Sequence, residues 1–284
     1  MNRQKAVLVT GASSGIGRAT ALYLADKGHK VYAGVRKNDD LQNLREAGSQ
    51  NLHPIIIDVV SNESINNALM VISEKEGNEL FGLINNAGIG CGGALEVTST
   101  EDIHNVFNVN VIGMMEVTKA FLPLLRNAKG KIINIGSTAS FLSVPGASVY
   151  SASKYAVRAF SDSLRRELYP FGIDVVMVAP GAIESEIWNK SLAQKKHLRE
   201  IIDPELAELY TPLRKFGDKM ATELKKIPAV EVAKVVEEVL VSNKPKLVCT
   251  VGDDIKAARK VSRLPAALLD KIIYKRIQKI ASSY

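Results

Sequence analysis

Three side chains in the middle of the chain could move a proton together: Ser137, Tyr150 and Lys154. Tyr150 and Lys154 are four residues apart, so on a helix they face the same way and the ammonium lies close to the phenol. A free phenol has a pKa of about 10, and an adjacent cation lowers that pKa because it favours the phenolate. Such a tyrosine can give a proton to a carbonyl oxygen, or take one from an alcohol, as hydride is transferred. Ser137 could hydrogen-bond the same substrate oxygen.

The Tyr-x-x-x-Lys pattern occurs twice in the chain, so position has to choose between the copies. The first copy, Tyr23 and Lys27, lies on the helix expected after the first strand, where a packed tyrosine and a solvated lysine explain it. The second copy follows residues 142–147, a loop that leaves the carboxyl end of the fifth expected strand. Ligands bind at that edge of open α/β sheets. Tyr155 also neighbours the second lysine, but its spacing from the serine is wrong, and we therefore assign the acid–base role to Tyr150.

The elements that must position these residues form a regular series. Short β-branched runs alternate with stretches of helical period, which predicts βαβ units and a parallel sheet buried on both faces. The expected strands cover residues 6–9, 31–35, 55–58, 80–85, 131–135, 174–178 and 247–251. The expected helices cover residues 15–27, 40–47, 64–76, 100–127, 149–168 and 230–242. We predict a Rossmann-type, doubly wound α/β domain with a seven-stranded parallel sheet over residues 1–252.

A glycine-rich turn follows the first expected strand, with the sequence Thr10-Gly11-Ala12-Ser13-Ser14-Gly15-Ile16-Gly17. Glycine lets the backbone bend sharply and approach a pyrophosphate closely, and the next helix offers free N–H groups and the positive end of its dipole. Strand, turn and helix in this order predict a dinucleotide site. Its candidate contacts are Gly11, Ser13, Ser14, Gly15, Ile16 and Gly17.

The spacing Thr-Gly-x-x-x-Gly-x-Gly resembles that of the short-chain dehydrogenases/reductases, and the resemblance continues from about residue 5 to residue 251. It implies a nicotinamide-dependent oxidoreductase whose catalytic residues are Asn110, Ser137, Tyr150 and Lys154, with Asn110 holding a water that relays protons to Lys154. It also implies that Asn85 supports the sheet, and that Ser185 replaces the family's usual threonine at the nicotinamide carboxamide while keeping the hydroxyl. The further cofactor contacts that it implies are Asp58 and Val59 at the adenine, Asn86, Ala87, Gly88, Tyr150, Lys154, Pro180, Gly181, Ile183 and Ser185.

The end of the second expected strand decides between the two nicotinamide cofactors. An acid there would bind the ribose hydroxyls of NAD. This chain instead has Val35 followed by Arg36, whose guanidinium could bind the extra phosphate of NADP bidentately. We therefore predict NADP (NADPH) as cofactor and no metal site. Arg36 and Lys37 could instead be solvated charges, with Asp39 or Asp40 reaching the ribose of NAD.

The formal charge of +7 is concentrated at one end of the chain. Residues 244–284 hold ten Lys or Arg and three Asp or Glu, so the rest of the chain is neutral. A neutral body offers no broad basic surface for phosphates, and we expect no nucleic acid partner. Two cysteines and no secretory signal indicate a cytoplasmic protein, and no apolar segment approaches the roughly 18 residues of a membrane span.

Residues 181–228 are too many for a simple connection, and we predict a substrate lid with short helices of its own. The segment is markedly apolar, which is typical of core or of a pocket. Since it follows Pro180-Gly181 at the nicotinamide end, we predict a lipophilic ketone or secondary alcohol as substrate. The chain is similar to the steroid and retinol dehydrogenase branch of the family. The apolar residues of the lid are Ile183, Ile187, Trp188, Leu192, Leu206, Leu209, Tyr210, Leu213 and Phe216.

Residues 253–284 are predicted to form a basic, amphipathic helical extension. Its cations include Lys271, Lys275, Arg276 and Lys279. This layout is typical of a helix lying on an anionic membrane, but packing on the protein itself or on a second subunit would use the same pattern. The apolar residues that could share one face are Leu264, Leu268, Ile272, Ile273, Ile277 and Ile280.

Other functions remain open on the sequence. An NAD-dependent enzyme of the same family could act on a small polar substrate, and an inactive relative could sense NADP(H) and bind a partner. A sugar-nucleotide epimerase of the extended subfamily shares Tyr-x-x-x-Lys, but the glycine spacing and the short C-terminal part argue against it. We expect a hydrophobic small-molecule substrate and a homo-oligomer such as a homodimer.

Overall fold

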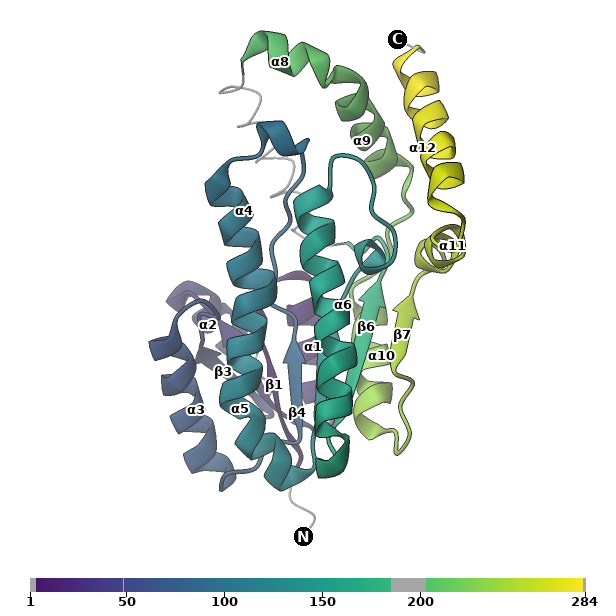
Figure 1. Cartoon of the computed structure of the whole chain (residues 1–284). Coiled ribbons are helices and arrows are strands. Elements are labelled where there is room, and N and C mark those ends of the chain that lie inside the picture. Colours follow the sequence, from purple (N-terminus) through teal and green to yellow (C-terminus); the bar gives the residue numbers. More distant parts are fainter. Residues whose placement is uncertain (1–3, 48, 185–202, 283–284) are drawn as a thin grey trace.

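The computed structural model describes residues 4–47, 49–184 and 203–282. Its centre is one parallel sheet of seven strands in the order β3-β2-β1-β4-β5-β6-β7 (Figure 1). The predicted Rossmann-type, doubly wound fold is confirmed. The strand order reverses between β1 and β4, and in such sheets the crevice at the reversal holds the ligand. The strands are β1 Ala6–Val9, β2 Lys30–Val35, β3 Leu52–Ile56, β4 Gly82–Asn85, β5 Lys131–Ile135, β6 Asp174–Pro180 and β7 Val248–Val251.

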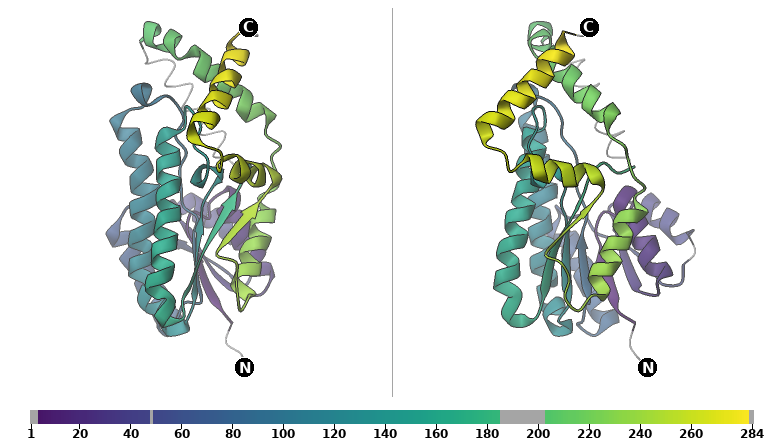
Figure 2. Two further views of the ribbon diagram at one scale, coloured as in Figure 1. Left: turned by 45° about the vertical axis from the view of Figure 1, so that its right-hand side comes forward. Right: turned by 90° about the vertical axis from the view of Figure 1, so that its right-hand side faces the viewer.

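Helices cover both faces of the sheet (Figure 2). One face packs against α1 (Gly15–Asp26), α2 (Asn38–Arg45) and α10 (Val230–Val241). The other packs against α3 (Asn62–Glu76), α5 (Met114–Ala128) and α6 (Ser148–Leu168), with α4 (Thr100–Phe107) beside α6. Because both faces are covered, the central strands are buried along their whole length rather than at every second residue.

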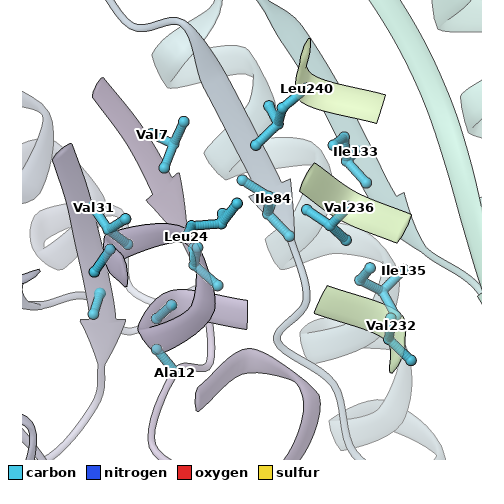
Figure 3. Close-up of a cluster of buried hydrophobic side chains, with 14 of the residues drawn as sticks. Val7, Ala12, Leu24, Val31, Ile84, Ile133, Ile135, Val232, Val236 and Leu240 are labelled. Carbon is cyan, nitrogen blue, oxygen red and sulfur yellow. The ribbon is translucent and has the colours of Figure 1, made fainter. Parts of the chain in front are cut away.

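The core beneath α1 and α10 shows how the helical period produces this burial. In α10 the buried residues Val232, Val236 and Leu240 recur every four positions and form one row facing the sheet. Leu24 of α1 and Ile84 of β4 are fully buried beside that row (Figure 3). This packing holds β1 and β4 rigidly, so the turns at their carboxyl ends have a fixed base.

Two predicted elements differ from the structure. The helix expected over residues 100–127 is interrupted by a π-helical turn, Asn108–Gly113, between α4 and α5. At Gly113, the last residue of this turn, a Cβ would lie 2.7 Å from the carbonyl oxygen of Val59, so the close approach requires glycine. Hydrophobic period alone cannot reveal such a turn, and π-turns are frequent at functional sites. The strand expected over residues 55–58 is β3, which begins and ends earlier and admits Pro54 because it is an edge strand.

The segment between β6 and α10 contains two described helices, α8 (Pro204–Leu209) and α9 (Thr211–Glu223), which lie beyond the carboxyl edge of the sheet (Figure 1). Its two ends meet, because Ile183 pairs with Ile227 in a parallel bridge. This agrees with the short helices predicted for the lid. After β7, α11 (Asp253–Val261) crosses the edge of the sheet and α12 (Ala266–Ala281) packs along α9 (Figure 2).

Candidate active site

The glycine turn lies at the reversal of strand order, and its glycines are required by geometry. Gly11 has a φ of 66°, and a Cβ on it would lie 2.8 Å from the Cα of Ala87. A Cβ on Gly17 would lie 2.2 Å from the carbonyl oxygen of Gly11. The side chain of Asn86 donates to the carbonyl oxygens of Thr10 (2.9 Å) and Gly11 (3.1 Å). The turns that follow β1 and β4 therefore form one rigid unit.

This unit fits the pyrophosphate of a dinucleotide. Ser14 is the N-cap of α1, but its side chain makes no capping hydrogen bond, and the first turn of α1 contains no acidic residue. The free N–H groups at the start of α1 are thus left for an anion. Gly15, with a φ of 55°, keeps the chain close to that position without a side chain in the way.

The catalytic residues predicted from the sequence converge at the carboxyl ends of β4 and β5. Ser137 follows β5 and its side chain lies beside that of Tyr150, in the first turn of α6. Lys154, one turn later, is buried, and its Nζ lies 5.9 Å from the centre of the Tyr150 ring. The same Nζ donates to the carbonyl oxygen of Ile135, the last residue of β5, at 3.0 Å. The strand end therefore fixes the position of the lysine.

The acidities of this pair differ from the prediction. Burial raises the pKa of Tyr150, and the nearby hydroxyl of Ser137 opposes this only in part. Burial also lowers the pKa of Lys154 from 10.5 to about 8. The predicted lowering of the tyrosine pKa is thus wrong for the protein alone, because desolvation is the largest influence on the Tyr150 pKa and raises it. A neutral phenol is the form that donates a proton.

Asn110 lies in the π-helical turn, where its side chain is buried. Its amide exchanges hydrogen bonds with the backbone of Ile89, at 2.8 and 2.9 Å, and donates to Ser153 in α6 at 3.1 Å. A Cβ on Gly88 would lie 3.3 Å from Oδ1 of Asn110 and 3.8 Å from Nζ of Lys154. Asn110 therefore joins the loop after β4 to the start of α6, and the water relay implied for it stays a prediction.

A buried polar chain supports this arrangement from below. Asn85 donates to Thr118 of α5 and to Asn134 of β5, both at 2.9 Å, and Asn134 donates to Ser161 of α6 at 2.9 Å. These bonds fix α5 and α6 against the two strands whose ends carry the site. Asn85 thus supports the sheet, as the resemblance implied.

The adenosine end of the predicted site is open. Arg36 directly follows the buried Val35, is exposed, and makes no ion pair with a described residue. Asp58 and Val59 lie just after β3 rather than at its end, and Asp58 accepts a hydrogen bond from the backbone of Val60 at 3.2 Å. Arg36 is therefore available to a ligand beside the glycine turn, which is itself tied to β2 through the carbonyl oxygen of Gly34.

The turn after β6 is held by a residue that the sequence did not indicate. Asp254, in the first turn of α11, accepts the backbone N–H of Ala182 at 2.7 Å. A Cβ on Gly181 would lie only 1.9 Å from Oδ1 of Asp254. Ile183 is buried at the base of the lid, and Ser185 lies outside the described residues. The only sequence signal for Asp254 was its place just after the last strand, which is not specific.

Tyr155 and Tyr23 have surroundings different from those of Tyr150. The hydroxyl of Tyr155 donates to the carbonyl oxygen of Phe141 at 2.6 Å, so it supports the loop after β5. Tyr23 lies near the end of α1 with Nζ of Lys27 5.4 Å from its ring centre, and that lysine is exposed. The Tyr23–Lys27 pair therefore has the same contact between ammonium and ring as Tyr150–Lys154. Its lysine is not buried, however, and the pair does not lie at the carboxyl edge of the sheet.

Comparison with known proteins agrees with this geometry. The family model described as short chain dehydrogenase matches residues 5–196. The chain is 34% identical to the NADPH-dependent 3-dehydrocapnine reductase of Ornithobacterium rhinotracheale, over 96% of this chain and 97% of that protein. It is 35% identical to retinol dehydrogenase 7 of Rattus norvegicus, over 96% of this chain and 88% of that protein.

A solved structure is similar over nearly the whole chain. The short-chain dehydrogenase/reductase of Burkholderia phymatum in complex with NAD superposes with a TM-score of 0.76 at 26% identity, over 91% of this chain and 92% of that one. The resemblance to the retinol dehydrogenase branch is confirmed by the relatives. The chain therefore belongs to the short-chain dehydrogenase/reductase family of oxidoreductases.

Proposed function

We propose that this enzyme transfers hydride between NADP(H) and a lipophilic ketone or secondary alcohol. The observation that carries the proposal is the juxtaposition of Ser137 and Tyr150, with buried Lys154 one helical turn away, at the edge of the sheet beside the glycine turn. The bound nicotinamide supplies or accepts the hydride. The chain's own residues hold the substrate oxygen and move its proton.

Each of the three side chains has a separate task. Ser137 donates a hydrogen bond to the substrate oxygen as negative charge develops on it. Tyr150, whose pKa is raised by burial, delivers its hydroxyl proton to that oxygen in the direction of reduction. Lys154 then stabilises the resulting phenolate, since its ammonium is fixed above the ring by Ile135.

The preference for NADP(H) rests on Arg36. Its exposed guanidinium follows β2 directly, and no acid occupies position 35 or 36 to bind ribose hydroxyls. One relative is named as NADPH-dependent, whereas the similar structure contains NAD. We expect Arg36→Gln to lower kcat/KM for NADPH by about tenfold or more and to leave that for NADH nearly unchanged, because a charge-assisted bond contributes about 1.5–3 kcal/mol. Lys37→Gln is the matched control.

The lipophilic substrate is inferred from the lid. Leu213 of α9 lies beside Gly146, which is in the loop that leads to Tyr150. A Cβ on Gly146 would lie 3.8 Å from Cγ of Leu213. Tyr210 donates to Glu96 at 2.7 Å, which holds the junction of α8 and α9 over the chain after β4. The relative named as a retinol dehydrogenase supports an apolar substrate. Ile187, Trp188 and Leu192 lie outside the described residues.

A panel of carbonyl compounds tests this function. Ketones and aldehydes of increasing apolar length are offered with NADPH and with NADH, and the reverse oxidation is run with the matching alcohols. We expect kcat/KM with NADPH to rise with apolar length. Faster turnover of small polar carbonyls with NADH would support the polar-substrate alternative instead, and tight NADPH binding without turnover of any compound would support the sensor.

A further inference from the structure

The C-terminal helix α12 has two apolar rows, and α9 covers only one of them. Ile280 is buried and Ile273 and Ile277 are partly buried, and Arg276 pairs with Glu223 of α9 at 2.6 Å. Leu268 and Ile272, by contrast, are 46% and 47% exposed. The prediction that all these residues share one face is therefore wrong: the helix packs on its own body and still presents a second row to solvent.

The exposed row lies among lysines. Lys271 and Lys275 follow Leu268 and Ile272 by three residues each, so they lie on the same side of the helix. Leu264, in the turn before α12 and 36% exposed, continues the row. Asp270, the one acid of α12, lies on another side. We call this surface the tail face and define it as Leu264, Leu268, Lys271, Ile272 and Lys275.

We propose that the tail face binds reversibly to an anionic phospholipid surface. Its leucines and isoleucine would enter the boundary between headgroups and acyl chains, while the lysine stems extend so that the ammonium groups reach the phosphates. The charge is complementary, since residues 244–284 carry the whole net charge of +7. A nucleic acid would satisfy the charges but leave the apolar row in water, which favours lipid as the partner.

The expected attachment is weak and peripheral. No helix in the described part of the chain is long and apolar enough to cross a membrane. Each lysine near an anionic surface strengthens binding about fivefold, and each half-exposed Leu or Ile adds a similar factor when it is buried. Binding should therefore require anionic lipid and weaken as salt screens the charges.

The place of the tail face gives this attachment a use. Because α12 packs along α9 with the side opposite the tail face, a membrane under the tail face would lie about one helix diameter from the lid (Figure 2). A lipophilic substrate could then leave the bilayer within a short distance of the active site. This use rests on the proposed function, whereas the binding itself does not.

Vesicle flotation of the full chain tests the proposal. Vesicles of phosphatidylcholine alone and of phosphatidylcholine with phosphatidylglycerol are compared at low and high salt. We expect flotation only with the anionic vesicles at low salt, and a loss of about 25-fold in the partition coefficient for Lys271→Gln with Lys275→Gln. The matched control is Lys27→Gln with Lys75→Gln, two exposed lysines on α1's end and on α3, which should float like the unaltered protein.

Three results would overturn the proposal. The first is that the unaltered protein does not float with anionic vesicles, and the second is that the Lys271/Lys275 variant floats equally well. The third is that Leu268→Ser with Ile272→Ser changes the molecular mass of the protein in solution and leaves its flotation unchanged, which would indicate that a second copy covers the tail face. Reduction of a soluble carbonyl without vesicles, measured on the same variants, should stay unchanged. Vesicle binding without any carbonyl reduction would count against the proposed function and not against the tail face.

Discussion

The contact between Gly181 and Asp254 allows a quantitative test of how the C-terminal part positions the active site. Asp254 accepts the N–H of Ala182 at 2.7 Å, and Ala182 is buried. Asp254→Ala leaves that N–H without its acceptor, which should cost about 1–3 kcal/mol. Since this turn follows β6 at the predicted nicotinamide end, we expect the cost to be divided between the free energy of unfolding and the affinity for NADPH.

Gly181→Ala perturbs the same contact from the other side. A methyl group there would lie 1.9 Å from Oδ1 of Asp254, so the carboxylate or the turn has to move. Overpacking of this kind costs about 1–3 kcal/mol or more. In the double variant the carboxylate is absent, so Gly181→Ala should cost less than it does alone. We expect a coupling energy of about 1–3 kcal/mol between the two positions.

The assay is a double-mutant cycle read in two ways, by urea denaturation and by the Kd of NADPH from fluorescence titration. Asp254→Asn keeps an acceptor and should recover most of the loss. Asp253→Ala is the matched control, because the Asp253 side chain is 96% exposed and its salt bridge is to the exposed Lys256. Additive costs of Gly181→Ala and Asp254→Ala, or an equal effect of Asp253→Ala, would refute the reasoning.

Three further predictions concern other parts of the fold. Gly17→Ala should weaken NADPH binding at least tenfold, as judged by titration, because its Cβ would lie 2.2 Å from a carbonyl oxygen; Gly217→Ala, with open space around it, should leave binding unchanged. Lys131→Met should lower the free energy of unfolding, measured by urea denaturation, by about 1–3 kcal/mol, because the buried ammonium donates to carbonyl oxygens of α10 at 2.9 and 3.0 Å. The same substitution at the exposed Lys119 should change it by less than about 0.5 kcal/mol. The pKa of Lys154 is lowered from 10.5 to about 8, so between these pH values the unfolded chain binds more protons than the folded one and stability should rise with pH. From pH 8 to 9.5 the free energy of unfolding of the unaltered, cofactor-free protein should increase by up to about 2 kcal/mol relative to that of Lys154→Met. A difference between the two proteins that does not change with pH would contradict the lowered pKa.

The sequence predicted the fold well because its signals were local and repeated. Continuous apolar strands and helical rows such as Val232, Val236 and Leu240 determine a doubly wound sheet, and the glycine turn locates its ligand edge. The π-helical turn at Asn110 could not be predicted, since it depends on the close approach of Gly113 to Val59, a contact between distant segments. The same is true of Asp254, whose role depends on where α11 crosses the sheet.

The choice of Tyr150 was made from position, and the structure shows why position was needed. Tyr23 with Lys27 and Tyr150 with Lys154 place the ammonium at similar distances from the ring, 5.4 and 5.9 Å. Of these two pairs, only Lys154 is buried and bound to a strand end, and only Tyr150 lies beside Ser137. The direction of the tyrosine pKa was predicted wrongly, because desolvation cannot be judged from spacing.

The most direct test of the central claim, that Tyr150 is the catalytic acid and base, is single-turnover hydride transfer in Tyr150→Phe. NADPH oxidation by saturating enzyme is followed after mixing with a reducible ketone, and the Kd of NADPH is measured separately. We predict that transfer slows by about 10²–10⁴-fold, while Kd changes less than about twofold and Tyr23→Phe behaves like the unaltered protein. Transfer at an unchanged rate in Tyr150→Phe, with NADPH bound normally, would contradict the account.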